Sequence, residues 1–268
     1  MEKVMYTVWK PATIDAEEFR EVLIGPLFEA LEEVGIRGYR ACVSDAEACK
    51  SKLRVVSTRP QPDAFLSIWM NSMMPLRRDP IEDVIAEHVD RFHGYLVTES
   101  EPYPNTEHLP EKPGDRTFGM NQIVMLKVPN RISWEYWLET WHGSHGIMGM
   151  GTQSTFGYRQ NVIVRALTYA APHYDAFVEE NFPEQSMTDI AHYHDSEGKK
   201  KEEWDPLIEK YYPGVKAAGD GRDGKERWEI NFQILTDSVD RFIDRGQTSY
   251  IKPKIDCMPF SEYIMKGI

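Results

Sequence analysis

The sequence has few cysteines, no long apolar run and no extended basic cluster. Its three cysteines, Cys42, Cys49 and Cys257, are odd in number and lack metal-ligand spacing, which favours free thiols in a reducing cytoplasm. No stretch approaches the roughly 20 apolar residues of a membrane helix, and the first residues have the pattern of a strand instead of a signal peptide. The formal net charge of -12 would repel a phosphate backbone. We therefore expect a cytoplasmic protein that binds neither nucleic acid nor a membrane.

Several sequence signatures of cofactor and metal chemistry are also missing. The chain has no phosphate-binding loop, no GxSxG nucleophile elbow and no dinucleotide-binding fingerprint, which disfavours phosphoryl and hydride transfer. His192 and His194 form a His-x-His pair, but no third ligand accompanies them at a recognisable spacing. We therefore predict a function that uses no metal and no cofactor.

The sequence does contain an internal repeat. Three tripeptides recur in the same order: Gly38-Tyr39-Arg40 as Gly157-Tyr158-Arg159, Asp63-Ala64-Phe65 as Asp175-Ala176-Phe177, and Asp90-Arg91-Phe92 as Asp240-Arg241-Phe242. The offset grows from 112 to 150 residues between the last two pairs, so the second copy contains an insertion of about 38 residues. We predict a structural repeat over residues 1–110 and a functional repeat over 117–268, with an inserted helical lid at about 183–225.

Each repeat has the same expected order of elements, β-α-β-β-α-β. In the first copy we expect strands at 4–10, 36–44, 63–70 and 94–99, with helices at 15–34 and 81–92. In the second we expect strands at 122–128, 155–167, 173–180 and 248–256, with helices from 133 to 148 and at 236–243. This order is the ferredoxin-like arrangement, which has both helices on one face of an antiparallel sheet. Packing the two apolar sheet faces together predicts an α+β fold, an intrachain dimeric α/β barrel. Homodimerisation is left open.

The segment from Ser133 to Met148 is the most unusual of the chain. At helical spacing, Trp137, Trp141 and His145 fall on one face, and His142 lies at its edge. The tryptophans suit either a core or a substrate pocket. An imidazole in an aromatic pocket can move protons near neutral pH, so His145 and His142 are the predicted catalytic groups.

The first repeat supports a catalytic interpretation of these histidines. An offset of 118 residues places Ile24 and Leu27 opposite His142 and His145, so packing alone does not require imidazoles there. We expect Phe19, Leu23, Ile24 and Leu27 to fill the corresponding space of the first repeat as solid core.

Further candidates lie on a strand and in the insertion. Tyr158 and Gln160 share one face of the strand at 155–167, and Tyr158 is the predicted phenolic partner of the catalytic histidine. Tyr39 occupies the equivalent position in the first repeat, so a structural role for this tyrosine is an equal alternative. His192 and His194 could be lent to the pocket by the lid. Trp137, Trp141, Gln160, His192 and His194 form the predicted substrate-binding set.

The helix also carries a family resemblance. Trp137, Thr140, Trp141 and His145-Gly146-Ile147 resemble the aromatic-rich helix of EthD-like members of the dimeric α/β-barrel superfamily, and Ile24-Gly25-Pro26-Leu27 resembles a degraded copy. His142 can also be aligned with the family histidine. The resemblance implies a ferredoxin-like barrel. Related barrels include cofactor-free cyclases, isomerases, decarboxylases and dehydratases of aromatic, lactone or polyketide-like compounds, and others that bind haem.

Together these features predict a cofactor-independent lyase or isomerase that uses histidine acid/base catalysis on a small apolar molecule. Two alternatives are a haem-binding barrel, with His145 or His142 as the axial ligand, and a non-catalytic small-molecule-binding protein.

Overall fold

The computed structural model describes residues 1–56, 59–195, 206, 209–210, 227–244 and 255–267. The first half of the chain contains the elements β1 (Glu2–Trp9), α1 (Ala16–Ile24), α2 (Pro26–Glu33), β2 (Gly38–Val43), η1 (Ala48–Lys50), β3 (Ala64–Met70), α3 (Pro75–His88) and β4 (Arg91–Tyr103). A capping box starts α1: Asp15 accepts the amide of Glu18, and the Glu18 carboxylate accepts the amide of Asp15. Gly25 ends α1, and Pro26 begins α2 at the first helical position, where its missing N–H costs nothing.

The second half contains a similar set of strands with a different helical layer. Its described elements are β5 (Met120–Leu126), α4 (Trp134–Glu139), the π-helical turn η2 (Thr140–His145), α5 (Gly146–Thr152), β6 (Gly157–Ala166), β7 (Ala176–Phe182), η3 (Glu184–Met187), α6 (Ile190–Tyr193), α8 (Arg227–Phe242) and β8 (Asp256–Lys266). Ser133 caps α4 by accepting the amide of Tyr136.

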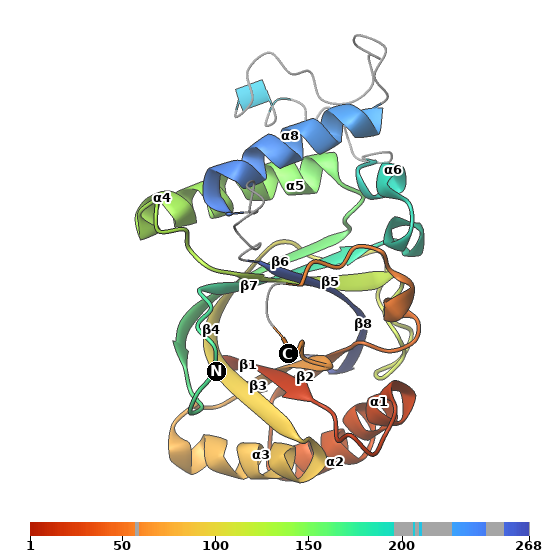
Figure 1. Cartoon of the computed structure of the whole chain (residues 1–268). Helices are drawn as coiled ribbons and strands as arrows, with labels where there is room; N and C mark the ends of the chain where they lie inside the picture. Colours follow the sequence, from red (N-terminus) through yellow and green to blue (C-terminus); the bar gives the residue numbers. More distant parts are fainter. Residues whose placement is uncertain (57–58, 196–205, 207–208, 211–226, 245–254, 268) are drawn as a thin grey trace.

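Eight antiparallel strands form one closed barrel, in the order β1-β3-β2-β8-β5-β7-β6-β4. The first half contributes β4-β1-β3-β2 and the second β8-β5-β7-β6, so the strand order is the same in both. The halves meet at β2–β8 and at β4–β6, where their edge strands pair. Helices α1, α2 and α3 cover one side of the barrel, whereas α4, α5 and α8 cover the opposite side (Figure 1). The fold is therefore α+β.

Several element boundaries differ from the sequence prediction. The last strand is predicted at 248–256, of which residues 248–254 lie outside the described part of the chain, and the described strand β8 runs on from Asp256 to Lys266. The helix predicted at 81–92 ends at His88, because the chain from Arg91 onward pairs with β1. The single helix predicted from Ser133 to Met148 is interrupted by η2. Most of the insertion predicted to form a lid lies outside the described residues, and its described part contains η3 and α6.

Three apolar clusters make up most of the described core, and a smaller fourth one surrounds Phe182 and Tyr193. One lies between α1, α2, α3 and the first-half sheet, and a second lies between α4, α5, α8 and the second-half sheet. A third, which includes Met5, Phe65, Tyr95, Phe177 and Phe260, fills part of the barrel interior. The barrel therefore separates two helical cores, so a cavity in one helical layer is distinct from the packing of the other.

Replacing Leu27 by alanine should lower the free energy of unfolding by about 2 to 5 kcal/mol, because Leu27 is completely buried in the first-half core. Urea unfolding of the variant measures this loss. The matched control is Leu76→Ala on α3, where the side chain is 83% exposed and a change within about 0.5 kcal/mol is expected. Equal losses in the two variants would contradict a solid first-half core.

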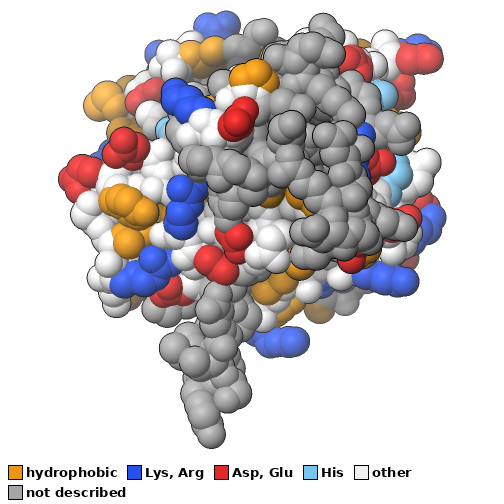
Figure 2. Space-filling view, turned by 90° about the horizontal axis from the view of Figure 1, so that it is seen from above, with side chains coloured by type: hydrophobic (Ala, Val, Ile, Leu, Met, Phe, Trp, Pro, Cys, Tyr) orange, Lys and Arg blue, Asp and Glu red, His pale blue; other side chains and the backbone are white. Residues whose placement is uncertain are grey.

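The outer surface of the second-half helices carries charges of both signs. On the face seen from the α8 side, described acidic and basic side chains are interspersed instead of forming a basic stripe (Figure 2). Within the described ranges, no helix combines the length and apolar character that crossing a bilayer requires.

Candidate active site

A cavity of about 170 Å³ lies between the second-half sheet and the helices that cover it. Its walls are mainly aliphatic and aromatic side chains: Val55, Val124, Leu126, Trp141, Val178, Leu235, Val239, Phe242, Ile243 and Ile255. The polar side chains on the same walls are those of Gln122, His145, Gln153, Tyr158, Glu180, Tyr193 and Cys257. A small apolar cavity with a few convergent polar groups is the usual form of a ligand site.

Glu180 lies at the centre of the polar wall. On β7 it pairs directly with Gln122 of β5 on one side and with Tyr158 of β6 on the other. Directly paired residues have Cβ atoms about 4.5–5.5 Å apart and project from the same face of the sheet. The three side chains therefore form a row across three neighbouring strands, all on the helix-covered face.

The equivalent row in the first half is different. Ile68 of β3 pairs with Val4 of β1 and Tyr39 of β2, so an aliphatic pair replaces Glu180 and Gln122. All three side chains belong to the first-half core, together with Leu23 and Leu27. The Tyr39 hydroxyl donates a hydrogen bond to the Leu23 carbonyl at 3.0 Å. This row is apolar apart from a satisfied hydroxyl, so the two halves differ in polarity at matching sheet positions.

Hydrogen bonds connect the polar groups of the cavity. The Gln122 amide donates to the Glu180 carboxylate at 3.4 Å and to the Tyr193 hydroxyl at 3.0 Å. The Trp141 indole donates to the Tyr158 hydroxyl at 2.9 Å. The Gln160 side chain also interacts with this hydroxyl as a donor, and no described residue accepts the phenolic proton, so the hydroxyl can donate to a bound molecule.

Burial raises the pKa of Glu180 to about 8, because the charged carboxylate loses its hydration in an apolar wall and the Gln122 amide only partly offsets this loss. Burial, followed by the charge of Glu180, also raises the pKa values of Tyr158, Tyr193 and Cys257. Glu180 is therefore the group in this cavity that can gain or lose a proton near neutral pH.

The π-helical turn η2 brings His145 into the cavity wall. A π turn shifts the following residues around the helix axis, and such turns are frequent at functional sites. The His145 Nδ1 atom is 3.1 Å from the Ser238 hydroxyl of α8, and its ring packs against Phe242 with centroids 4.5 Å apart. Burial, and then the positive charge of Arg241, lower the pKa of His145 to about 3. The imidazole is therefore neutral at physiological pH and a weak proton acceptor.

Three other predicted residues of this region lie outside the cavity wall. His142 is exposed and packs against the Trp141 ring at 4.6 Å. Trp137 is fully buried in the second-half core beside Trp141, with ring centroids 5.0 Å apart. Gln160 is buried below Gly146, where its side-chain oxygen accepts a hydrogen bond from Ser100 at 3.0 Å. Of the predicted set, the structure brings His145, Tyr158 and Trp141 together.

The two histidines of the insertion also lie off the cavity wall. His192 approaches the Ser186 hydroxyl at 2.9 Å through its Nδ1 atom. His194 is buried between Tyr193 and Phe232, and burial lowers its pKa to about 4. The intervening Tyr193 is the residue of α6 that reaches the cavity.

Sequence reasoning missed Glu180, although the repeat contained a signal for it. In the second copy, Asp175-Ala176-Phe177 continues as Val178-Glu179-Glu180, whereas the first copy continues as Leu66-Ser67-Ile68. The two adjacent acids stand where the first copy has Ser67 and Ile68. Because neighbouring residues of a strand point to opposite faces, they place one carboxyl group on each face of the sheet. Glu180 faces the cavity, and Glu179 faces the barrel interior.

The barrel interior holds a second group of polar side chains around Glu179. The Glu179 carboxylate bonds to Lys3 at 3.0 Å and to Arg40 at 2.9 Å, while Arg159 bonds to Glu262 at 3.0 Å. Asn161 and Asn181 donate further hydrogen bonds to the two carboxylates. Lys3 also pairs with Glu99. These contacts cross the barrel between strands of both halves.

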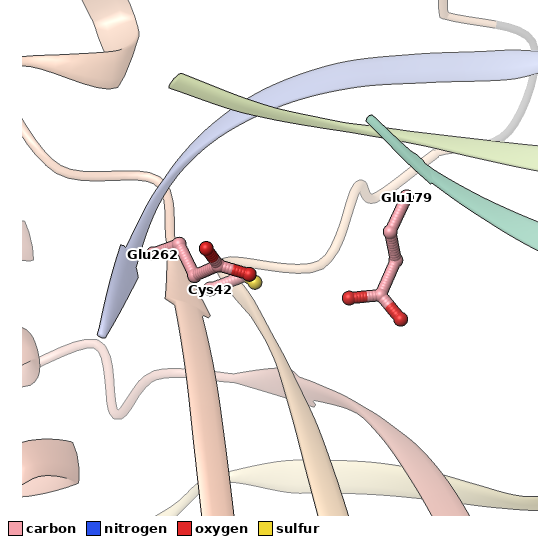
Figure 3. A group of neighbouring side chains, drawn as sticks. All are labelled: Cys42, Glu179 and Glu262. Atoms are coloured by element: carbon pink, nitrogen blue, oxygen red, sulfur yellow. The ribbon is translucent and has the colours of Figure 1, made fainter. Parts of the chain in front are cut away.

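Within the described residues, ligand atoms of Cys42, Glu179 and Glu262 lie within 4.8 Å of one another (Figure 3). Their charge environment is unsuited to a metal, because the cations Lys3, Arg40 and Arg159 already pair with the two carboxylates. Burial alone would raise the pKa of Glu179, but Lys3, Arg40 and Arg159 together lower it. Burial and the two glutamates raise the pKa of the Cys42 thiol, which disfavours the metal-binding thiolate. We interpret this group as a structural ion-pair network.

No protein-family model and no curated protein matches the sequence. Among solved structures, an anthrone oxidase-like protein matches 99% of this chain and 93% of its own, with 8% identity and a TM-score of 0.48. A putative monooxygenase from Lactobacillus acidophilus matches 100% and 97%, with 7% identity and a TM-score of 0.45. A chlorite dismutase mutant from Candidatus Nitrospira defluvii matches 97% and 90%, with 6% identity and a TM-score of 0.41. At these identities and scores, the likeness carries no argument about the reaction.

Proposed function

We propose that the second-half cavity is the active site of a cofactor-independent lyase or isomerase that acts on a small, apolar, oxygenated molecule. The observation that supports this most is Glu180, a buried carboxyl group whose pKa is raised to about 8 and which two polar residues flank in register. A buried acid tuned close to neutral pH is suited to both proton removal and proton donation. The aliphatic and aromatic walls suit an aromatic, lactone or polyketide-like ring.

In the proposed reaction, the ionised Glu180 carboxylate removes a proton from a carbon beside a substrate carbonyl. The electron pair of that C–H bond forms a carbon–carbon double bond while the π pair of the carbonyl moves to its oxygen, and the Tyr158 hydroxyl donates a hydrogen bond to the resulting enolate oxygen. Glu180 then returns the proton to another carbon in an isomerisation, or to a leaving hydroxyl group in a dehydration. The same charge stabilisation would serve decarboxylation or cyclisation.

This proposal assigns His145 a positioning role. With its pKa lowered to about 3, the imidazole is a weaker base than Glu180 and serves as a neutral hydrogen-bonding group of the wall. Its link to Ser238 joins η2 to α8 across the cavity. Trp141 holds the Tyr158 hydroxyl in place through its indole N–H.

The identical strand order of the halves supports the proposed tandem repeat and its EthD-like origin. The division of labour is part of this proposal, since Val4 and Ile68 stand where the second half has Gln122 and Glu180. Three further points remain predictions: a cytoplasmic location, the lack of nucleic-acid and membrane partners, and homodimerisation as an open alternative.

The two alternative functions are haem binding and non-catalytic ligand binding, and each predicts a different experimental result. Haem ligation through His145 would require room for a porphyrin, whereas a volume of about 170 Å³ is below the roughly 300–1,000 Å³ of usual drug-sized pockets. A Soret band on addition of haemin would favour that alternative. A non-catalytic binding protein would return its ligand chemically unchanged.

Proton abstraction can be tested without the natural substrate. We expect the wild-type protein to accelerate deuterium incorporation from D₂O into a member of a panel of aromatic ketones, lactones and cyclic diketones, followed by NMR. Glu180→Gln should reduce the enzymatic rate by about 10²- to 10⁴-fold, because the amide cannot accept the proton. The matched control is Glu184→Gln, at an exposed position of η3, which should keep the wild-type rate. Equal rates in wild type and Glu180→Gln would contradict the proposed role.

A further inference from the structure

A second cavity, of about 200 Å³, lies at one end of the barrel and shares no lining residue with the active-site cavity. It is formed by the end of β1, the start of β4 and the end of β5, together with two loops. Thr7 and Trp9 of β1 pair directly with His93 and Arg91 of β4 at its rim. The loops contribute residues 59–62 and residues 170, 172 and 174.

The polar groups of this barrel-mouth cavity favour a negatively charged ligand. Its described lining residues include Arg59 and Arg91 and no carboxylate. Neither arginine forms an ion pair with a described residue. The Arg91 guanidinium lies 3.9 Å from the centre of the Trp9 ring, a stacked position that fixes the group and leaves its N–H donors for another acceptor. Two guanidinium groups on the wall of one cavity, without a carboxylate, are typical of an anion site.

Three buried polar atoms around this cavity lack hydrogen-bond partners among the described residues: Thr7 Oγ1, Trp9 Nε1 and His93 Nδ1. Thr7 is 2% exposed, and it alternates along β1 with residues of the first-half core, so its side chain faces the barrel interior. Buried polar atoms in folded proteins are nearly always satisfied, and a group of three around one cavity indicates a bound species. An indole N–H only donates, so that species must accept hydrogen bonds.

The remaining wall is apolar and indicates the other half of the ligand. Pro60, Pro62, Met125, Pro172 and Tyr174 also line the cavity. Inorganic phosphate would leave these surfaces without a partner, whereas an acid with a flat or branched apolar body would cover them.

We propose that the barrel-mouth cavity is a binding site for a small organic carboxylate, which the guanidinium groups of Arg91 and Arg59 and the Trp9 indole recognise. The carboxylate accepts hydrogen bonds from the indole and the guanidinium groups, and the apolar body packs against the proline and aromatic wall. The site is independent of the proposed catalytic function.

Benzoate is a direct probe of this site. With tryptophan indoles labelled with ¹⁵N, titration should shift the Trp9 N–H signal saturably, with that signal identified from its loss in Trp9→Phe. Arg91→Gln and Arg59→Gln should each weaken benzoate binding by at least tenfold. The control Arg77→Gln removes the same charge from an exposed position of α3 and should bind as wild type does. Unchanged signals of the other indoles confirm that the variants fold.

Three comparison ligands separate the proposal from its alternatives. Benzamide, which has the same ring without the charge, should bind at least tenfold more weakly than benzoate. Inorganic phosphate and acetate should also bind more weakly, because they lack the apolar body. Equal binding of phosphate or acetate would overturn the assignment of an organic acid. A linear, unsaturated response, no Trp9 shift, or a shift confined to Trp137 and Trp141 would overturn the site itself.

Discussion

The wild-type protein should lose stability relative to a Glu180→Gln variant as the pH rises from about 5 to about 8. The folded protein holds the Glu180 proton up to a pKa of about 8, whereas the unfolded chain releases it near the ordinary carboxyl pKa of 4.5. Between these values the folded state binds one more proton than the unfolded state, so rising pH favours unfolding by up to about 1.4 kcal/mol per pH unit. The contribution of the Glu180 proton to stability is fully present below the unfolded pKa and is lost as the pH rises through the folded pKa.

Urea unfolding of both proteins at pH 5, 6.5 and 8 measures this effect. The glutamine side chain that replaces Glu180 cannot titrate. The free energy of unfolding of the variant, relative to that of the wild type, should therefore rise by up to about 4 kcal/mol between pH 5 and pH 8. Glu184→Gln, at an exposed position, should show no pH-dependent difference from wild type. A constant difference between wild type and Glu180→Gln would mean that Glu180 titrates as an ordinary carboxyl group, and the proposed acid/base role would fail with it.

Replacing Glu179 by glutamine should lower the free energy of unfolding at neutral pH by about 3 to 5 kcal/mol. The change removes a fully buried negative charge that pairs with Lys3, Arg40 and Arg159, and it leaves these cations close together inside the barrel. Breaking a buried ion pair by removing one partner is costly for this reason. Because the pKa of Glu179 is lowered, its stabilising contribution exists above the unfolded value of about 4.5 and is lost as the pH falls.

The measurement is again denaturant unfolding, at neutral and at acidic pH. The comparison variant is Glu101→Gln, whose carboxylate also pairs with Arg159 but is 38% exposed, and whose loss should cost about 1 kcal/mol or less. The penalty of Glu179→Gln should shrink progressively as the pH falls below about 4.5, because the unfolded wild-type chain then binds a proton at Glu179 that the folded protein, with its lowered pKa, does not yet bind. An unchanged or increased stability at neutral pH would contradict the structural role of the network.

Local sequence patterns predicted most of the strands within a few residues. Alternation and β-branched residues located β1, β3 and β7, and the repeated tripeptides identified matching positions of the two halves. The final strand was predicted to end at Asp256, whereas β8 runs on from Asp256 to Lys266, where it pairs with β5 and then with β2; residues 248–254 lie outside the described part of the chain. Pairing with distant strands decides such boundaries, and a local window does not contain that information.

The candidate site was predicted only in part for related reasons. Helical spacing placed His145 and Trp141 correctly on the cavity side, but the π turn at 140–145 has no clear local signature. Glu180 was overlooked because an acid on a strand usually faces solvent, and here the helices α4, α5 and α8 cover that face (Figure 1). Lys3 and Arg40 would be assigned to the surface for the same reason, yet they lie inside the barrel.

The way the two halves share the buried ion-pair network has a consequence for partner choice. The first half supplies the cations Lys3 and Arg40, of which Lys3 also pairs with Glu99 of the same half, whereas the second supplies the buried Glu179 and Glu262 together with Arg159. Two copies of the first half would bring together four cations with only the partly exposed Glu99 and Glu101 carboxylates to pair with, and two copies of the second half would bring four buried carboxylates and only two arginines. Each sheet is therefore electrostatically specific for the other and disfavours pairing with itself. Charge complementarity thus specifies a heterologous pair within one chain, and each half depends on the other to neutralise its interior.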